Sequence, residues 1–117
     1  MEKIEVGYRK IGFGHYHKFI IYTDSTGVQW AASGWAGGLP SSVPAGDFSQ
    51  AQSGSGGGFG NIITTIGRYD SSYPDHPDYG SANNEYQIEL IKTGNDLSQY
   101  WESIKTAMND IANGEYQ

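Results

Sequence analysis

The stretch His15–Trp35, HYHKFIIYTDSTGVQWAASGW, decides the fold because it predicts a β-hairpin. Residues 15–23 alternate between two faces, Asp24-Ser25-Thr26-Gly27 has the composition of a turn, and residues 28–34 return. The two faces of the first strand carry His15, His17, Phe19 and Ile21 on one side and Tyr16, Lys18, Ile20 and Tyr22 on the other. Because both faces are partly apolar, we expect this strand to lie in the middle of a sheet.

The remaining periodic segments predict three more strands and one helix. Residues 4–9, 61–69 and 85–93 have the alternation or β-branched content of strands. In residues 96–113, Asp96 is the expected N-cap, with Gln99 completing a capping box. One apolar stripe follows, made of Leu97, Trp101, Ile104, Met108 and Ile111. The sequence therefore predicts an α+β fold, in which one C-terminal amphipathic helix packs on an antiparallel sheet of about five strands.

The length of 117 residues suits a single domain spanning residues 1–117. Within it, residues 34–60 contain two prolines and the segment SGSGGG. Glycine-rich chain gains little from burial and loses much backbone entropy on ordering. We expect residues 34–60 to form one long Gly-rich loop.

Charge and composition narrow the function classes. The formal net charge of −6 disfavours binding to nucleic acid and to acidic membranes. It is compatible with a protein partner that has a basic surface, and the alternative is that the charge serves solubility alone. The absence of cysteine excludes disulfides, thiolate metal sites and a cysteine nucleophile within this sequence. We expect neither a signal peptide nor a transmembrane segment, because no apolar run is long enough. The composition gives no indication of the cellular compartment.

The histidines are the first candidates for chemistry. His15 and His17 lie two residues apart on a predicted strand and so share a face, as in half of a metal site. The possible further ligands are His76, Asp75 and Asp78, but no spacing forces them to meet. The alternative is that one histidine packs in the sheet and the other faces solvent. We predict no metal site and no cofactor.

His17 also suits a general base at the start of a strand, with Gln29 or Asp24 holding its tautomer. The nucleophile is the missing part. Ser33, Ser41 and Ser42 follow the hairpin, but none lies in a G-x-S-x-G frame.

The run His17-Lys-Phe-Ile-Ile-Tyr22, followed by a turn and strand, a Gly-rich stretch and a late amphipathic helix, resembles permuted papain-like domains of the NlpC/P60 and LRAT-like type. The resemblance is most specific over residues 10–35. It implies a peptidase, amidase or acyltransferase fold in which His17 is the catalytic histidine. In such domains a cysteine begins a helix, whereas here the helix begins Asn95-Asp-Leu-Ser98 and no cysteine occurs.

The segment from Tyr69 to Tyr79 is dense in Asp and Tyr, which make adaptable contacts at low entropic cost. The residues expected to form a recognition surface are Trp30, Trp35, Tyr69, Tyr73, Asp75, His76, Asp78 and Tyr79. The first hypothesis is a small acidic protein-binding module that uses these loops and has no turnover. The alternative is a papain-like hydrolase, acyltransferase or toxin domain of bacterial type, with His17 as base and its nucleophile missing or outside this chain.

Overall fold

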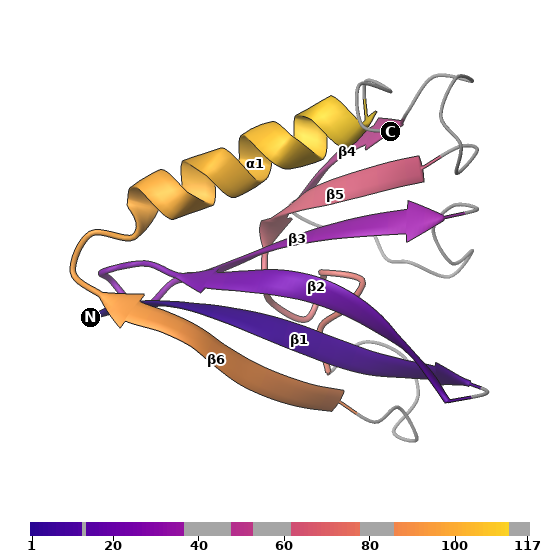
Figure 1. Ribbon diagram of the computed structural model, residues 1–117, viewed down its shortest axis with the longest axis horizontal. Coiled ribbons are helices and arrows are strands. Elements are labelled where there is room, and N and C mark those ends of the chain that lie inside the picture. The colour runs from indigo at the N-terminus through magenta and orange to yellow at the C-terminus, as the bar shows by residue number, and fades with distance from the viewer. Residues whose placement is uncertain (13, 37–47, 53–61, 78–85, 113–117) are drawn as a thin grey trace.

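The computed structural model describes residues 1–12, 14–36, 48–52, 62–77 and 86–112 (Figure 1). Within these residues, six strands and one helix form in the order Glu2–Gly12 (β1), His15–Thr23 (β2), Gln29–Ala36 (β3), Phe48–Gln52 (β4), Ile62–Arg68 (β5), Tyr86–Gly94 (β6) and Ser98–Ala112 (α1). The strands make one antiparallel sheet in the order β4-β5-β3-β2-β1-β6. The predicted α+β class is confirmed, and the helix packs on the sheet.

The predicted loop over residues 34–60 differs from the structure at two places. β3 continues to Ala36, and β4 forms a sixth strand inside the predicted loop, pairing with β5 from Phe48↔Gly67 to Gln52↔Ile63. The β4 sequence FSQAQ has little apolar alternation, so its own composition does not predict a strand. Backbone pairing with β5 specifies the strand instead. Residues 37–47 and 53–61 lie outside the described part of the chain.

The hairpin forms as predicted, and β2 lies centrally between β3 and β1. Its turn is organised by the Asp24 carboxylate, whose Oδ1 accepts hydrogen bonds from Thr26 N at 2.9 Å and Val28 N at 3.0 Å. Gly27 has a φ of +89°, a backbone conformation that glycine adopts at little cost. Turn chemistry and strand alternation therefore agree, which fixes the register from Thr23↔Gln29 onward.

One core lies between α1 and the sheet. Leu97, directly before the helix, and Trp101 within it pack with Ile4, Tyr22 and Ala32, and the rings of Tyr22 and Trp101 stack with centroids 5.6 Å apart. Further out, Ile20, Trp30, Ile66, Ile104 and Met108 are partly buried against this cluster. The predicted apolar stripe of the helix therefore faces the sheet, and its last member, Ile111, is half-buried.

The helix start differs slightly from the prediction. Helix α1 begins at Ser98, and the carbonyl of Leu97 accepts the first helical hydrogen bond from Trp101 N at 3.1 Å. Asp96 therefore lies one position before the N-cap, where its carboxylate accepts from Ser98 Oγ at 3.4 Å. A buried carboxylate from β1 binds the backbone at the helix start instead: Glu2 Oε2 accepts a hydrogen bond from Leu97 N at 3.2 Å.

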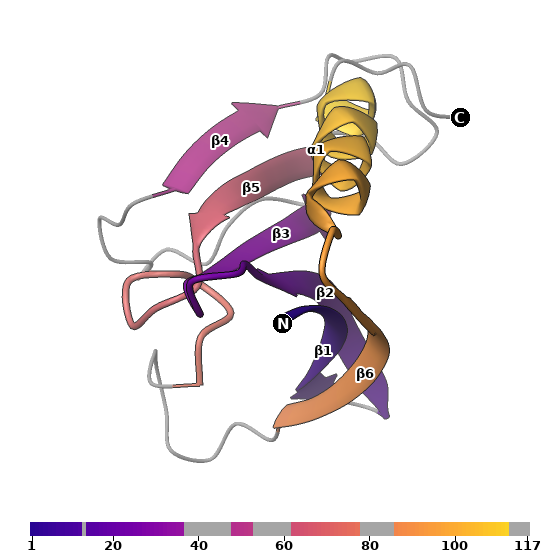
Figure 2. The same ribbon diagram turned by 90° about the vertical axis from the view of Figure 1, so that its left-hand side faces the viewer.

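A second core lies on the opposite face of the sheet. Phe19, Ile21 and Ala31 pack there against Tyr69 and Tyr73 from the segment that follows β5. Figure 2 shows α1 on one side of the sheet and this segment on the other. The apolar residues on both faces of β2 are explained by these two cores.

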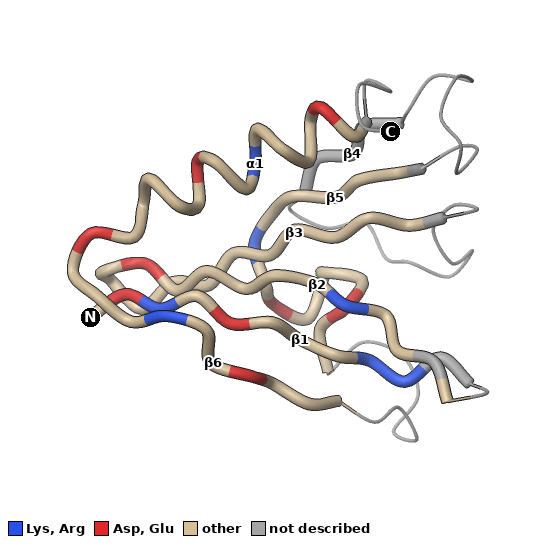
Figure 3. The backbone as a smooth tube through the Cα atoms, viewed as in Figure 1, with Lys and Arg blue, Asp and Glu red and all other residues tan. Residues whose placement is uncertain are grey.

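Charged residues are dispersed along the chain. Figure 3 shows acidic and basic positions interspersed along β1 and α1 rather than gathered in one block. No helix in the described part of the chain has the length and apolar character that a bilayer crossing requires.

Candidate functional site

The segment 69–77 folds over the sheet through two consecutive turns. Asp70 Oδ1 accepts hydrogen bonds from Ser72 N at 3.0 Å and Ser72 Oγ at 2.6 Å, and Tyr73 N donates to the Asp70 carbonyl at 2.8 Å. His76 N then donates to the Tyr73 carbonyl at 3.0 Å. The hydrogen bonds from Ser72 lower the pKa of Asp70. These turns direct Tyr73 and Asp75 toward the sheet.

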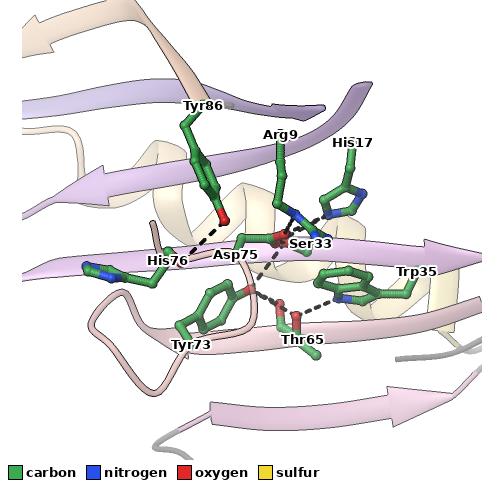
Figure 4. A network of polar contacts seen from close by, with 9 residues as sticks. All are labelled: Arg9, His17, Ser33, Trp35, Thr65, Tyr73, Asp75, His76 and Tyr86. Atoms are coloured by element: carbon green, nitrogen blue, oxygen red, sulfur yellow. Dashed lines mark hydrogen bonds and ion pairs between the residues drawn. The ribbon is translucent and has the colours of Figure 1, made fainter. Parts of the chain in front are cut away.

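Asp75 is the centre of the site, and none of its surface is exposed. Its carboxylate lies 3.2 Å (Oδ1) and 3.3 Å (Oδ2) from His17 Nε2, and Oδ1 lies 3.3 Å from Arg9 Nε. Ser33 Oγ donates a hydrogen bond to Oδ2. Figure 4 shows the carboxylate among these three side chains, which come from the adjacent strands β1, β2 and β3. Arg9 and His17 are directly opposite each other in the β1–β2 register.

The positive charge of Arg9 explains how a carboxylate is tolerated inside the protein. A buried ion is costly unless it is paired, and Arg9 and His17 keep only 14% and 13% of their side-chain surface exposed. Arg9 Nε and Asp75 Oδ1 are close enough for an ion pair, but their angles fall outside hydrogen-bond geometry. The pair is therefore held by charge attraction, and directional hydrogen bonding to Asp75 comes from Ser33 and His17.

Aromatic packing fixes the orientation of the His17 ring. It stacks on Trp35 with centroids 4.3 Å apart and planes 26° apart, and Phe19 lies on the same face of β2 at 6.1 Å. The Arg9 guanidinium lies 5.4 Å from the Trp35 ring centroid. With Nε2 held at the carboxylate, Nδ1 is the remaining ring nitrogen, and it has no polar contact with the residues described.

Hydroxyl groups extend the network deeper into the sheet. Tyr73 OH donates toward Ser33 Oγ at 3.4 Å and lies 2.9 Å from Thr65 Oγ1, which accepts from Trp35 Nε1 at 3.1 Å. Burial raises the pKa of Tyr73. The network thus links the segment 69–77 to four strands and holds Trp35, the residue on which His17 stacks.

The structure corrects the residue expected to orient His17. The side-chain amide of Gln29 donates to Thr23 Oγ1 at 3.3 Å, and Asp24 organises the hairpin turn. Asp75 contacts the imidazole instead, from 58 positions away. No local pattern around His17 could have indicated this partner, because the contact depends on how residues 69–77 fold back.

The expected recognition surface is also corrected. Trp35, Tyr69, Tyr73 and Asp75 are all buried, so these four side chains are not available to a partner in this structure. For Tyr69, Tyr73 and Asp75 the prediction differs because a segment rich in Asp, Pro and Tyr usually lies at the surface. The burial of Tyr69 and Tyr73 is favourable because their rings remove the apolar face of β2 and β3 from water.

The other expected binding residues lie apart from one another. Trp30 is half-buried on the helix side of the sheet, where its Nε1 donates to Asp24 Oδ2 at 3.1 Å. His76 is half-buried, with its ring 4.9 Å from that of Tyr69. Asp78 and Tyr79 lie outside the described residues.

Possible nucleophiles do not face His17 within the described part. Ser33 is fully buried and donates to the same carboxylate as His17, so it has no access to a substrate. Helix α1 begins on the opposite face of the sheet, where Leu97 packs in the helix-side core. Its first turn therefore cannot meet His17, unlike the helix that the papain-like resemblance implies. Ser41 and Ser42 lie outside the described residues.

The histidines and carboxylates described in the structure do not form a metal site. Among the side chains described, no three His, Asp or Glu residues gather as a metal site would require. His17 and Asp75 are in contact, but the third charged neighbour is Arg9, a cation. The side chain of His15 and residue Asp78 are not among those described.

Comparisons with known proteins add no relative. No protein-family model matches the chain, and neither a curated protein nor a solved structure shows significant similarity to it.

Proposed function

We propose that this domain carries the acid–base part of a hydrolase or acyltransferase site, in which His17 is the general base and Asp75 orients it. One observation carries the proposal: His17 Nε2 lies within 3.3 Å of both oxygens of a fully buried carboxylate. A histidine base needs a partner that fixes its tautomer and ring orientation, and a carboxylate is the usual one.

The chemistry follows from the assignment of the two ring nitrogens. With Nε2–H donated to Asp75, the lone pair of Nδ1 can accept a proton from a hydroxyl, a thiol or water. The Asp75 carboxylate, which lies beside Arg9, would stabilise the imidazolium that forms. The proton returns from Nδ1 to the leaving group in the second half of the reaction. This role agrees with the resemblance to permuted papain-like domains.

The proposal requires a nucleophile from outside the described residues, because Ser33 is enclosed and α1 lies on the other face. It can belong to another part of this chain or to a chain that joins it. In either case His17 itself must be accessible and basic, which makes the base testable on its own.

The test is cleavage of an activated ester such as p-nitrophenyl acetate, which a free imidazole nitrogen accelerates. We expect His17→Gln to remove most of the rate above buffer, and Asp75→Asn to lower it while His17 is still present. His76→Gln is the matched control, because His76 is also half-buried, with its ring packed against Tyr69. Equal rates for the two histidine variants, with both proteins folded, would contradict the proposal.

A second candidate, a binding module without turnover for a basic protein, is favoured by the exposed edge strand β6. Ile88 and Leu90 are 47% and 56% exposed there, and an edge strand offers free backbone groups to a partner strand. The test compares capture of partners by the wild-type protein and by Leu90→Lys. Unchanged capture by the variant would exclude this strand as the binding surface.

A further inference from the structure

Helix α1 covers only part of its face of the sheet. It contacts β5, β3 and β4, and beside it a groove of about 450 Å³ remains open over β1 and β2. The groove is lined by Ile4, Val6, Ile20, Ile91, Lys92, Tyr100, Ser103, Ile104 and Ala107. It lies on the face opposite His17 and Asp75, so it is separate from the site proposed above.

A β-bulge shapes the outer wall of this groove. In the β1–β6 ladder Ile4 pairs with Lys92 and Glu5 pairs with Leu90, which leaves Ile91 as the extra residue. Ile91 and Lys92 consequently both line the groove, although neighbours on a regular strand point to opposite faces. Ile91 stays 56% exposed, so the aliphatic wall is open to solvent.

Polar groups are confined to a few of the lining residues. The floor residues Ile4, Val6 and Ile20 are aliphatic, whereas Lys92, Tyr100 and Ser103 supply an ammonium and two hydroxyls. The Lys92 ammonium lies 4.8 Å from the Tyr100 ring centroid. None of the nine lining residues is acidic. The surface of the groove is thus almost entirely apolar, and Lys92 is its one cationic lining residue.

We propose that this groove binds a long-chain fatty acid, with the aliphatic chain on the floor and the carboxylate at Lys92. The volume falls in the range of about 300–1,000 Å³ that small-molecule sites occupy. The single cation among aliphatic side chains is complementary to one anionic head group. The net charge of −6 does not prevent this, because charges beyond about 8 Å are screened at physiological salt.

The test is a titration of the protein with saturated fatty acids of increasing length, below their micelle concentrations, and with the matched fatty alcohols. Each added methylene should tighten binding by about two- to fourfold, as expected for partial to full burial. Lys92→Gln should weaken fatty-acid binding about tenfold and leave alcohol binding unchanged. Lys105→Gln is the matched control, since Lys105 also lies over an aromatic ring, Trp101, but does not line the groove.

A second pair of variants tests the location. Ser103→Trp places a large ring in the groove and should abolish binding of both acids and alcohols, whereas Thr106→Trp, at an exposed helix position that does not line it, should not. The proposal is overturned by affinities independent of chain length, by equal effects of the two lysine variants, or by binding that survives Ser103→Trp. Analytical ultracentrifugation gives one more test. If the wild-type protein is a dimer and Ser103→Trp is a monomer, the groove is occupied by a second copy of the chain and the proposal is overturned.

Discussion

At the scale of single residues, Asp75 determines how the segment 69–77 is held. Its carboxylate faces Arg9 and His17, and both would lose their partner if it were removed. We expect Asp75→Asn to lower the free energy of unfolding by about 3 kcal/mol, at the lower end for a broken buried ion pair because both partners keep some exposure. Urea denaturation measures the loss. Asp70→Asn, in the same segment but only half-buried, should cost about 1 kcal/mol or less.

Gly7 shows a second residue-level constraint. A Cβ built at Gly7 would collide with the ring of Phe19, and Phe19 is only 2% exposed. Gly7→Ala should therefore destabilise the protein by about 1 to 3 kcal/mol through overpacking. Thermal unfolding of Gly7→Ala alone and combined with Phe19→Leu checks the cause. A double variant no more stable than Gly7→Ala would show that the ring contact is not responsible.

The sequence could predict the face of His17 but not its partner. Strand alternation places His17, Phe19 and Ile21 on one side, and the structure confirms the second core there for Phe19 and Ile21. The contact with Asp75 comes from a segment whose composition resembles a surface loop. Local sequence patterns carry no information about such a contact. It forms because the segment 69–77 packs on the apolar face of the sheet, which removes that face from water.

At the scale of elements, the hairpin turn has a pH dependence of predictable sign. Hydrogen bonds from the Thr26 side chain and from Trp30 lower the pKa of Asp24 to about 2. A carboxyl whose pKa is lower in the folded state contributes stability above its unfolded pKa of about 4, and loses it as the pH falls toward 2. Asp70, whose pKa is also lowered, adds to the same window.

We therefore expect stability to fall between about pH 4 and pH 2, and Asp24→Asn to make this fall shallower. Chemical denaturation at a series of pH values measures it. Asp110→Asn removes a carboxylate from the exposed surface of α1 without touching the turn, so it serves as the control. If the free energy of unfolding falls equally steeply with pH in the wild type and in Asp24→Asn, Asp24 is not the group responsible.

Helix α1 depends on one aromatic anchor. Trp101 is 6% exposed and stacks on Tyr22, whereas its neighbour Tyr100 is 50% exposed. We expect Trp101→Ala to cost about 3 to 5 kcal/mol, and Tyr100→Ala to cost less than about 1 kcal/mol. Equilibrium unfolding followed by far-ultraviolet circular dichroism compares the two. Similar losses for both variants would show that the helix is not anchored through this stripe.

Elements with strong periodicity could be predicted, and the element without it could not. The hairpin and α1 combine periodic apolar residues with turn or helix-end signals, and both form with small changes at their ends. β4 has a polar sequence and is specified by pairing with β5. The N-cap of α1 is Leu97 rather than Asp96, and Glu2, distant in sequence, accepts a hydrogen bond from Leu97 N there.

At the scale of the whole molecule, the sheet has two different faces with different roles. One face is covered in part by α1 and leaves the apolar groove, and the other is covered by the segment 69–77 with its polar network. Tyr69 and Tyr73, which the sequence predicts in a recognition surface, are core residues because they cover the apolar side chains of this second face. The packing of the segment 69–77 on this face also brings Asp75 to His17.

The measurement that tests this account most directly is the tautomer of His17, read from long-range ¹H–¹⁵N NMR spectra of the uniformly labelled protein. The account predicts that the neutral imidazole carries its proton on Nε2, donated to Asp75, and that Nδ1 is the basic nitrogen. Asp75→Asn should weaken this preference. A proton found on Nδ1 in the wild-type protein, or a mixture of tautomers unaffected by Asp75→Asn, would contradict the account.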